Sequence, residues 1–223
     1  EDLRYEGNAS EWRMIERDLG LVQETGCRYH VCHLSTREGL ELIRGAKRSG
    51  LPVSCETAPH YLTLTAESRA EDADGRFHMN PPLRSAADRA ALIEGLADGS
   101  VDCVATDHAP HTRADKARGA MGIVGMETAF PVVYTRLVRT GLVSLERVID
   151  AMSVRPRALF RLGGGRVEAG CPAELALLEL DETYTLRAED FATRSRSTPF
   201  EGWRVQGRVL RLFGAKEKND AEK

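Results

Sequence analysis

Long apolar runs, a net positive charge and a regular cysteine pattern are all missing from this 223-residue sequence. Without an apolar segment of about 20 residues, a helix cannot span a bilayer. The first ten residues, EDLRYEGNAS, do not resemble a signal peptide. The formal net charge of −3 gives no reason to expect binding to nucleic acid or to an anionic membrane.

The five cysteines are odd in number and scattered, which indicates reduced thiols in a cytoplasmic protein and not a disulfide framework. An initiator methionine is also missing, since residue 1 is Glu, and we expect the chain to be part of a longer one. Hydrophobic residues make up 42% of the chain and charged residues 29%, which is typical of a globular protein with a sizeable core.

Segments with helical periodicity alternate with short apolar runs through the first 165 residues. The spacing predicts helices over residues 10–25, 36–50, 85–99, 126–141 and 144–156, and strands within 27–35, 52–58 and 101–106. The stretch from 66 to 75 is polar and predicted to be irregular. This alternation implies a parallel α/β sheet, open or closed. From about residue 166 the pattern changes to short strands, so we expect two parts, 1–165 and a small β-rich segment 166–223 that ends in a charged tail.

Three predicted strands in succession end in residues that bind protons or metals. The residues are Cys32 and His33 after the first strand, Glu56 and His60 at the second, and Asp107, His108 and His111 in the motif VATDHAPHT. In parallel α/β folds the reactive groups lie at the carboxyl ends of the strands, so these residues predict one shared polar site. A zinc ion there would lower the pKa of bound water to roughly 7, and a nearby carboxylate could carry the proton. The pattern favours a metal-assisted hydrolase.

Taken singly, each of these residues also has a structural interpretation. A histidine at a strand end is more often a hydrogen-bonded structural residue than a ligand, and Asp107 could be an N-cap or a loop carboxylate. His30 and Cys32 lie on the strand face opposite to His33, which favours packing. For Glu56 we expect an ion pair, and for the histidine after Asp107 a supporting role in the loop.

Five motifs together resemble the dihydroorotases, zinc enzymes of pyrimidine biosynthesis in the amidohydrolase superfamily. They are YHVCHLST, CETAPHYLTLT, FHMNPPLRS, VATDHAPHT and GIVGMETAFPVVYT, and they occur in the family's order. The resemblance implies a (β/α)8 TIM-type barrel with a small β-sandwich. It covers essentially the whole chain, so we expect part of the barrel in residues 1–165 and part of the β-sandwich in 166–223.

The resemblance also implies an activity, the reversible hydrolysis of the cyclic amide of (S)-dihydroorotate to N-carbamoyl-L-aspartate. It identifies His33 as a zinc ligand and Asp107 as both a zinc ligand and the catalytic acid/base. One or two Zn2+ ions are implied for each intact site. The implied setting is cytoplasmic with a small-molecule substrate, and a homodimer and an association with aspartate transcarbamoylase are left open.

The same resemblance gives a set of residues that bind the substrate. Asn80 and His111 would hold the ring, with His111 near its carboxylate. Family members often carry Phe-Gly in the loop after the signature, where the main chain touches the substrate; here the pair is Met121-Gly122. Because that contact uses the main chain, the change from Phe to Met puts little in doubt.

One departure from the family is substantial. The His-x-His-x-Arg signature, which supplies two zinc ligands and a carboxylate-binding Arg, does not occur, and the closest pair, His30 and His33, is separated by two residues. We therefore expect this chain to be a C-terminal portion that is inactive alone. Two other functions are considered: a related cyclic amidase (allantoinase or dihydropyrimidinase), which the presence of Asn80 and His111 argues against, and a non-catalytic scaffold for aspartate transcarbamoylase.

Overall fold

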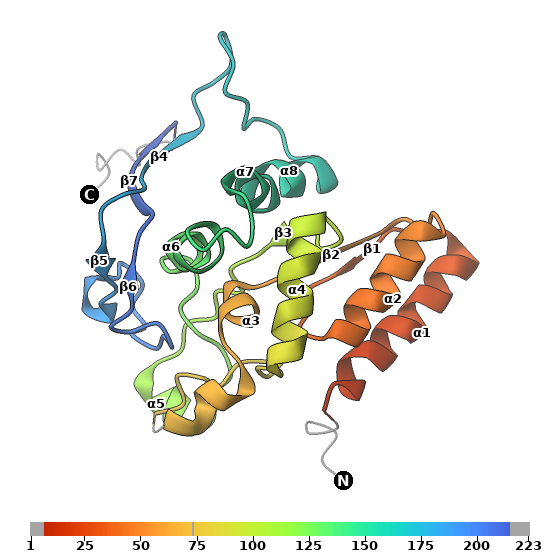
Figure 1. Cartoon of the computed structure of the whole chain (residues 1–223), viewed down its shortest axis with the longest axis horizontal. Coiled ribbons are helices and arrows are strands. Elements are labelled where there is room, and N and C mark those ends of the chain that lie inside the picture. The colour runs from red at the N-terminus through yellow and green to blue at the C-terminus, as the bar shows by residue number, and fades with distance from the viewer. Residues whose placement is uncertain (1–6, 73, 215–223) are drawn as a thin grey trace, which may run out of the picture.

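A small parallel sheet organises the first half of the chain. The computed structural model describes residues 7–72 and 74–214. Strands β1 (Tyr29–Val31), β2 (Val53–Thr57) and β3 (Cys103–Val104) pair in that order, all parallel. Helices α1 (Ala9–Thr25) and α2 (Arg37–Arg48) pack side by side next to the sheet, and α2 also packs against α4 (Ala86–Asp98) (Figure 1). The alternation predicted from the sequence is confirmed in these elements.

Local capping and close packing explain where these helices lie. The Thr36 side chain accepts a hydrogen bond from the Gly39 N–H at the start of α2, and Ser85 and Asp88 form the expected capping box at the start of α4. Helices α2 and α4 approach closely at Gly95, where a Cβ would lie 2.7 Å from a methyl carbon of Leu40. This contact fixes the helix layer that covers one side of the strands.

Two short elements follow strand ends and were not predicted. Helix α3 (Pro59–Thr63) begins two residues after β2, and α5 (Arg113–Ala117) follows β3 after a loop. The stretch predicted to be irregular from residue 66 begins instead with a 3₁₀ helix, η2 (Ala66–Glu71). A capping box between Thr65 and Ser68 stabilises its first turn, which explains why a polar sequence without helical periodicity is ordered there.

The two helices predicted after residue 125 are each interrupted by a π-helical turn. Helix α6 (Ala129–Val133) continues as η3 (Tyr134–Val138). Helix α7 (Leu145–Ile149) continues through η4 (Asp150–Val154) into α8 (Arg155–Leu159). The second helix therefore extends past Pro156, where the sequence predicted its end. The wider π turn ends two residues before the proline and accommodates a residue that cannot donate a helical hydrogen bond.

The last part of the described chain is built from short antiparallel strands. Strand β4 (Leu175–Glu179) pairs with β7 (Arg208–Phe213), and β5 (Tyr184–Thr185) pairs with β6 (Arg204–Val205); the 3₁₀ turn η5 (Ala188–Asp190) follows β5. These strands lie across α6 from the parallel sheet (Figure 1). The division at residue 165/166 into a barrel part and a small β-rich segment stays a prediction, and the charged tail from residue 215 lies outside the described residues.

Among the described residues, three strands belong to the parallel sheet, and one isolated parallel bridge joins His108 to Ile123. No described helix has both the length and the apolar character needed to cross a bilayer. The carboxyl ends of β1, β2 and β3 meet at the same edge of the sheet, and the candidate site is found at this edge.

Candidate active site

Three side chains that can bind a metal follow the three parallel strands. His33 lies two residues after β1, His60 is in the first turn of α3 directly after β2, and Asp107 lies three residues after β3. The strand pairing brings their main chains together: the Leu34 N–H donates to the Glu56 carbonyl at 2.8 Å. The Nε2 atom of His60 lies 3.8 Å from Oδ2 of Asp107. His33 acts on the pKa of both His60 and Asp107, so the two histidines and the carboxylate lie near one another at this strand edge.

The ring nitrogens at this point are buried and lack hydrogen-bond partners within the described part of the chain. These atoms are Nδ1 of His33 and Nε2 of His60, and the His60 side chain is only 1% exposed. Burial lowers the pKa of His60 to about 3, and the nearby His33 contributes to the decrease. His60 is thus held neutral, the form in which imidazole binds metals. A buried polar atom without a partner usually has a ligand or a water to satisfy it.

The main chain at His33 and Asp107 adopts the left-handed conformation. Their φ angles are 41° and 47°, and of the described residues only one other that is not glycine, Arg161, has a positive φ. Such a φ is disfavoured for most side chains and is found where the surrounding structure imposes it, often at functional sites. At His33 this conformation interrupts the alternation of side chains between the two faces of the sheet that begins in β1. The direction of the His33 side chain therefore cannot be read from the strand pattern.

Burial also affects the carboxyl group of Asp107. Desolvation raises its pKa, Glu56 raises it further by charge repulsion, and His33 lowers it. The side chain remains 27% exposed, so a small molecule can reach it. A carboxyl group with a raised pKa beside the neutral imidazole of His60 is suited to accept a proton and to return it.

A cavity of about 700 Å³ opens beside His33. Its wall includes Asn80, Met121 and Arg84, together with residues of α1 and β1. The structure thus brings two of the predicted substrate residues, Asn80 and Met121, to the same cavity as a predicted zinc ligand. The volume is in the range of small-molecule sites.

Hydrogen bonds between its main chain and residues outside it hold the Met121-Gly122 loop in place. The Met121 carbonyl lies 2.8 Å from Nε2 of His111, and the Gly122 N–H donates to the His78 carbonyl at 2.9 Å. Gly122 has a φ of 134°, and a Cβ there would lie 2.6 Å from the carbonyl oxygen of Ala109. The pair therefore has a fixed geometry, and His111 contacts this loop.

Lys116 joins this loop to the segment that carries Asn80. Its side chain is 4% exposed, and its ammonium group donates at 2.9 Å to the carbonyl oxygens of His78, Ala120 and Gly122. Burial lowers the pKa of Lys116. This residue was not predicted as part of the site, because a lysine in a polar loop gives no sequence sign of burial.

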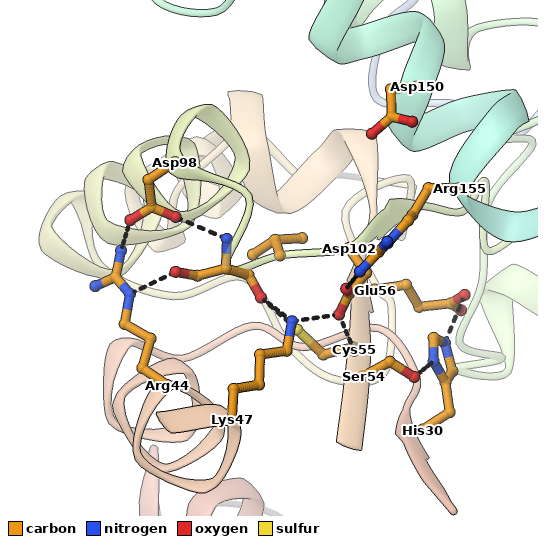
Figure 2. A network of polar contacts seen from close by, with 12 residues as sticks. His30, Arg44, Lys47, Ser54, Cys55, Glu56, Asp98, Asp102, Asp150 and Arg155 are labelled. Carbon is orange, nitrogen blue, oxygen red and sulfur yellow. Dashed lines mark hydrogen bonds and ion pairs between the residues drawn. The ribbon is translucent and has the colours of Figure 1, made fainter. Parts of the chain in front are cut away.

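The neighbouring polar residues have the structural contacts that the sequence favoured. His30 binds Ser54 Oγ at 2.7 Å through Nδ1 and Glu56 Oε2 at 3.1 Å through Nε2 (Figure 2). His108 accepts hydrogen bonds from the N–H groups of Gly125 and Met126 through Nδ1 and so supports the loop, as expected. His60, by contrast, was noted at its strand end but not predicted as a ligand. Its position directly after the strand and Pro59 was the available sign.

Comparison with known proteins establishes the family. Residues 6–213 match the amidohydrolase family. The chain belongs to this family. A dihydroorotase from Geobacillus thermodenitrificans is 48% identical over 203 residues, 89% of this chain and 47% of that protein. One from Enterococcus faecalis is 47% identical over 210 residues, 92% of this chain and 49% of that protein. The chain thus spans about half the length of these curated relatives.

Solved structures of amidohydrolases share the fold. The L-hydantoinase (dihydropyrimidinase) from Arthrobacter aurescens is 33% identical with a TM-score of 0.86, over 92% of this chain and 47% of that chain. The inactive dihydroorotase-like domain of a CAD-like multifunctional protein from Chaetomium thermophilum has a TM-score of 0.70 at 23% identity, over 91% of this chain and 54% of that domain, and shows the fold alone. The predicted amidohydrolase barrel fold, present in part, is confirmed.

Proposed function

We propose that this amidohydrolase acts as a dihydroorotase, which hydrolyses the cyclic amide of (S)-dihydroorotate reversibly to N-carbamoyl-L-aspartate. The proposal rests on one observation: His33, His60 and Asp107 lie near one another at one edge of the sheet, and His33 lines the same cavity as Asn80. The curated dihydroorotases that match 89% to 92% of the chain support the choice of substrate.

The donor chemistry of the residues at the strand edge fits a zinc ion. They offer two imidazole nitrogens and a carboxylate oxygen, which is a donor set typical of catalytic zinc. The unpartnered buried nitrogens of His33 and His60 are the specific support for a metal here. When bound, zinc supplies polarisation of the amide carbonyl and activation of water. His60 extends the ligand set of His33 and Asp107 that the resemblance implied.

The remaining steps are assigned to this chain's own side chains. Asp107 accepts the proton of the attacking water and delivers it to the leaving ring nitrogen, a role that its raised pKa suits. We assign Asn80, which lines the cavity, and His111, which contacts the Met121 carbonyl, to orienting the ring, and Met121 to one wall of the substrate site. Orientation of this kind lowers the barrier because less freedom is lost in the reaction step.

The proposal extends to the setting of the enzyme. We infer a role in pyrimidine biosynthesis, a cytoplasmic location and a small-molecule substrate. Association with a second copy or with aspartate transcarbamoylase stays a prediction. The printed name of the Chaetomium thermophilum domain, which belongs to a multifunctional protein, is compatible with such an association but concerns that protein.

The test is a hydrolysis assay with the complete gene product, purified with zinc. Dihydroorotate is expected to be turned over, and Asp107→Asn should reduce kcat by several orders of magnitude, at least about 100-fold. Asn also tolerates a left-handed φ, so the variant should fold. The matched control is Asp190→Asn, an exposed carboxylate in η5, away from the strand edge. Near-normal turnover by Asp107→Asn would refute the role assigned to this carboxylate.

A cyclic-amide hydrolase of different substrate preference is the second candidate, because the hydantoinase structure matches this chain with a TM-score of 0.86. The same preparation should be assayed with hydantoin, dihydrouracil and allantoin. A larger kcat/KM for any of these than for dihydroorotate would favour that candidate. Zinc retained without turnover of any substrate would favour the non-catalytic scaffold.

A further inference from the structure

A second group of metal-binding side chains lies on β2 and at the end of β1, and it is distinct from the ligand set proposed above. It consists of His30, Cys32 and Glu56, and one ligand atom from each lies within 4.8 Å of the others. His30 and Cys32 line the 700 Å³ cavity, and Cys32 is exposed. The side chains of His30 and Glu56 are 16% and 19% exposed. The group shares no residue with His33, His60 and Asp107.

The orientation of the His30 ring suits a metal ligand. Its Nε2 lies 3.1 Å from Oε2 of Glu56, while its Nδ1 lies 2.7 Å from Oγ of Ser54 (Figure 2). Ligand atoms around a tetrahedral zinc with bonds of about 2.0–2.3 Å lie roughly 3.3–3.7 Å apart, so the His30–Glu56 pair needs little adjustment. A histidine ligand commonly makes a hydrogen bond through its other ring nitrogen, as His30 does with Ser54.

Strand geometry explains why these residues meet. His30 and Ser54 occupy the same register position on the parallel strands β1 and β2. Cys32 and Glu56 are each two residues further along, so all four side chains lie on the same face of the sheet. That face is opposite to Val31 and Cys55, which are buried in the core. One nitrogen, one sulfur and one carboxylate oxygen therefore point to a common region from a rigid pair of strands.

We propose that His30, Cys32 and Glu56 bind a divalent cation of the zinc type, with a fourth coordination position open to the cavity. A thiolate ligand selects zinc and cobalt over magnesium and calcium, which prefer oxygen donors. The thiol proton of Cys32 passes to solvent when the metal–sulfur bond forms. The alternative is a His30–Glu56 ion pair beside a free thiol that binds no metal.

Cobalt(II) distinguishes this site from the one proposed for catalysis, since only a site with cysteine gives a thiolate-to-cobalt charge-transfer band. The metal-free 223-residue chain is titrated with Co2+ and followed in the near ultraviolet. We expect the band in the unchanged chain and in His60→Ala, and its loss in Cys32→Ser. The matched control is Cys27→Ser, another exposed cysteine, which should keep the band.

Either of two results overturns the proposal: absence of the band in the unchanged chain, or its survival in a folded Cys32→Ser variant. Failure of the catalytic proposal would leave this test unaffected, because dihydroorotate turnover is not measured in it.

A second measurement needs no variant. Iodoacetamide is allowed to react with the unchanged chain, with and without Zn2+, and each cysteine is followed by peptide mass spectrometry. The proposal predicts that Zn2+ slows the alkylation of Cys32 by roughly tenfold or more, since the metal-bound sulfur is a poorer nucleophile, while Cys27 is unaffected. Equal rates at Cys32 with and without Zn2+ refute the proposal.

Discussion

Replacement of Lys116 by methionine tests how the loops beside the candidate site are held. The ammonium group makes three hydrogen bonds of 2.9 Å to main-chain carbonyls. Hydrogen bonds to a charged group contribute about 1.5–3 kcal/mol each, but burial of the ammonium costs several kcal/mol, which methionine does not incur. The expected net loss of unfolding free energy is therefore about 2–4 kcal/mol. Methionine keeps the unbranched stem, so the packing changes little.

The loss should be measurable by thermal unfolding followed by circular dichroism. For a chain of this size, about 2–4 kcal/mol corresponds to a decrease in Tm of roughly 5–15 °C. Arg118→Met is the matched control: this side chain is exposed and, within the part of the chain that the structure describes, pairs only with Asp115, so little change in Tm is expected.

Hydrogen exchange adds a local measurement. The Gly122 N–H, which donates to the His78 carbonyl, should exchange faster in Lys116→Met, whereas amides of the α2–α4 contact keep their relative protection. An unchanged Tm together with unchanged exchange at Gly122 would show that Lys116 does not hold these loops.

Three further substitutions test other parts of the structure. Asp102→Asn should lower the unfolding free energy by about 3 kcal/mol in urea titrations, because Asp102 is 2% exposed and accepts hydrogen bonds from Lys47 and from the Cys55 N–H (Figure 2); an unchanged midpoint would contradict this. Burial raises the pKa of Cys55 from 9.0 to about 12, so its neutral thiol favours the folded state below pH 9, and this contribution is lost as the pH rises toward 12. Between pH 9 and 12 the urea midpoint of Cys55→Ala should therefore fall less than that of the unchanged chain. Equal decreases in the two midpoints would refute the assignment. Gly122→Ala should cost about 2–5 kcal/mol, because its Cβ would meet Ala109 at 2.6 Å with φ at 134°; a Tm equal to that of the unchanged chain would be incompatible with this loop.

The parts of the fold with strong local signals could be predicted from the sequence. Helices α1, α2 and α4 span enough turns for a buried stripe to show, and the spacing of Ser85 and Asp88 marks the start of α4. The π-helical turns could not be predicted, because the extra residue in each turn leaves no periodic pattern in five residues.

The site shows the same limits. Strand ends pointed to His33 and Asp107, but helix α3 is only five residues long, too short for periodicity to reveal, so the inward position of His60 became evident only from the structure. Strand alternation also fails at His33, where the φ of 41° sets the side chain direction. Burial of Lys116 depends on three carbonyl groups from two loops that no local pattern brings together.

The left-handed main chain at His33 and Asp107 has a consequence for how copies of this gene diverge. Only Gly, Asn, Asp and His adopt such a φ at low cost. Most other substitutions at these two positions therefore destabilise the main chain, whatever their effect on catalysis. A copy released from selection for catalysis but still required to fold should therefore accumulate Asn or Gly at position 107 and avoid Val or Ile, which are stiff near the main chain. Inactive copies that carry Val or Ile at position 107 and are equally stable would be evidence against this conformational constraint.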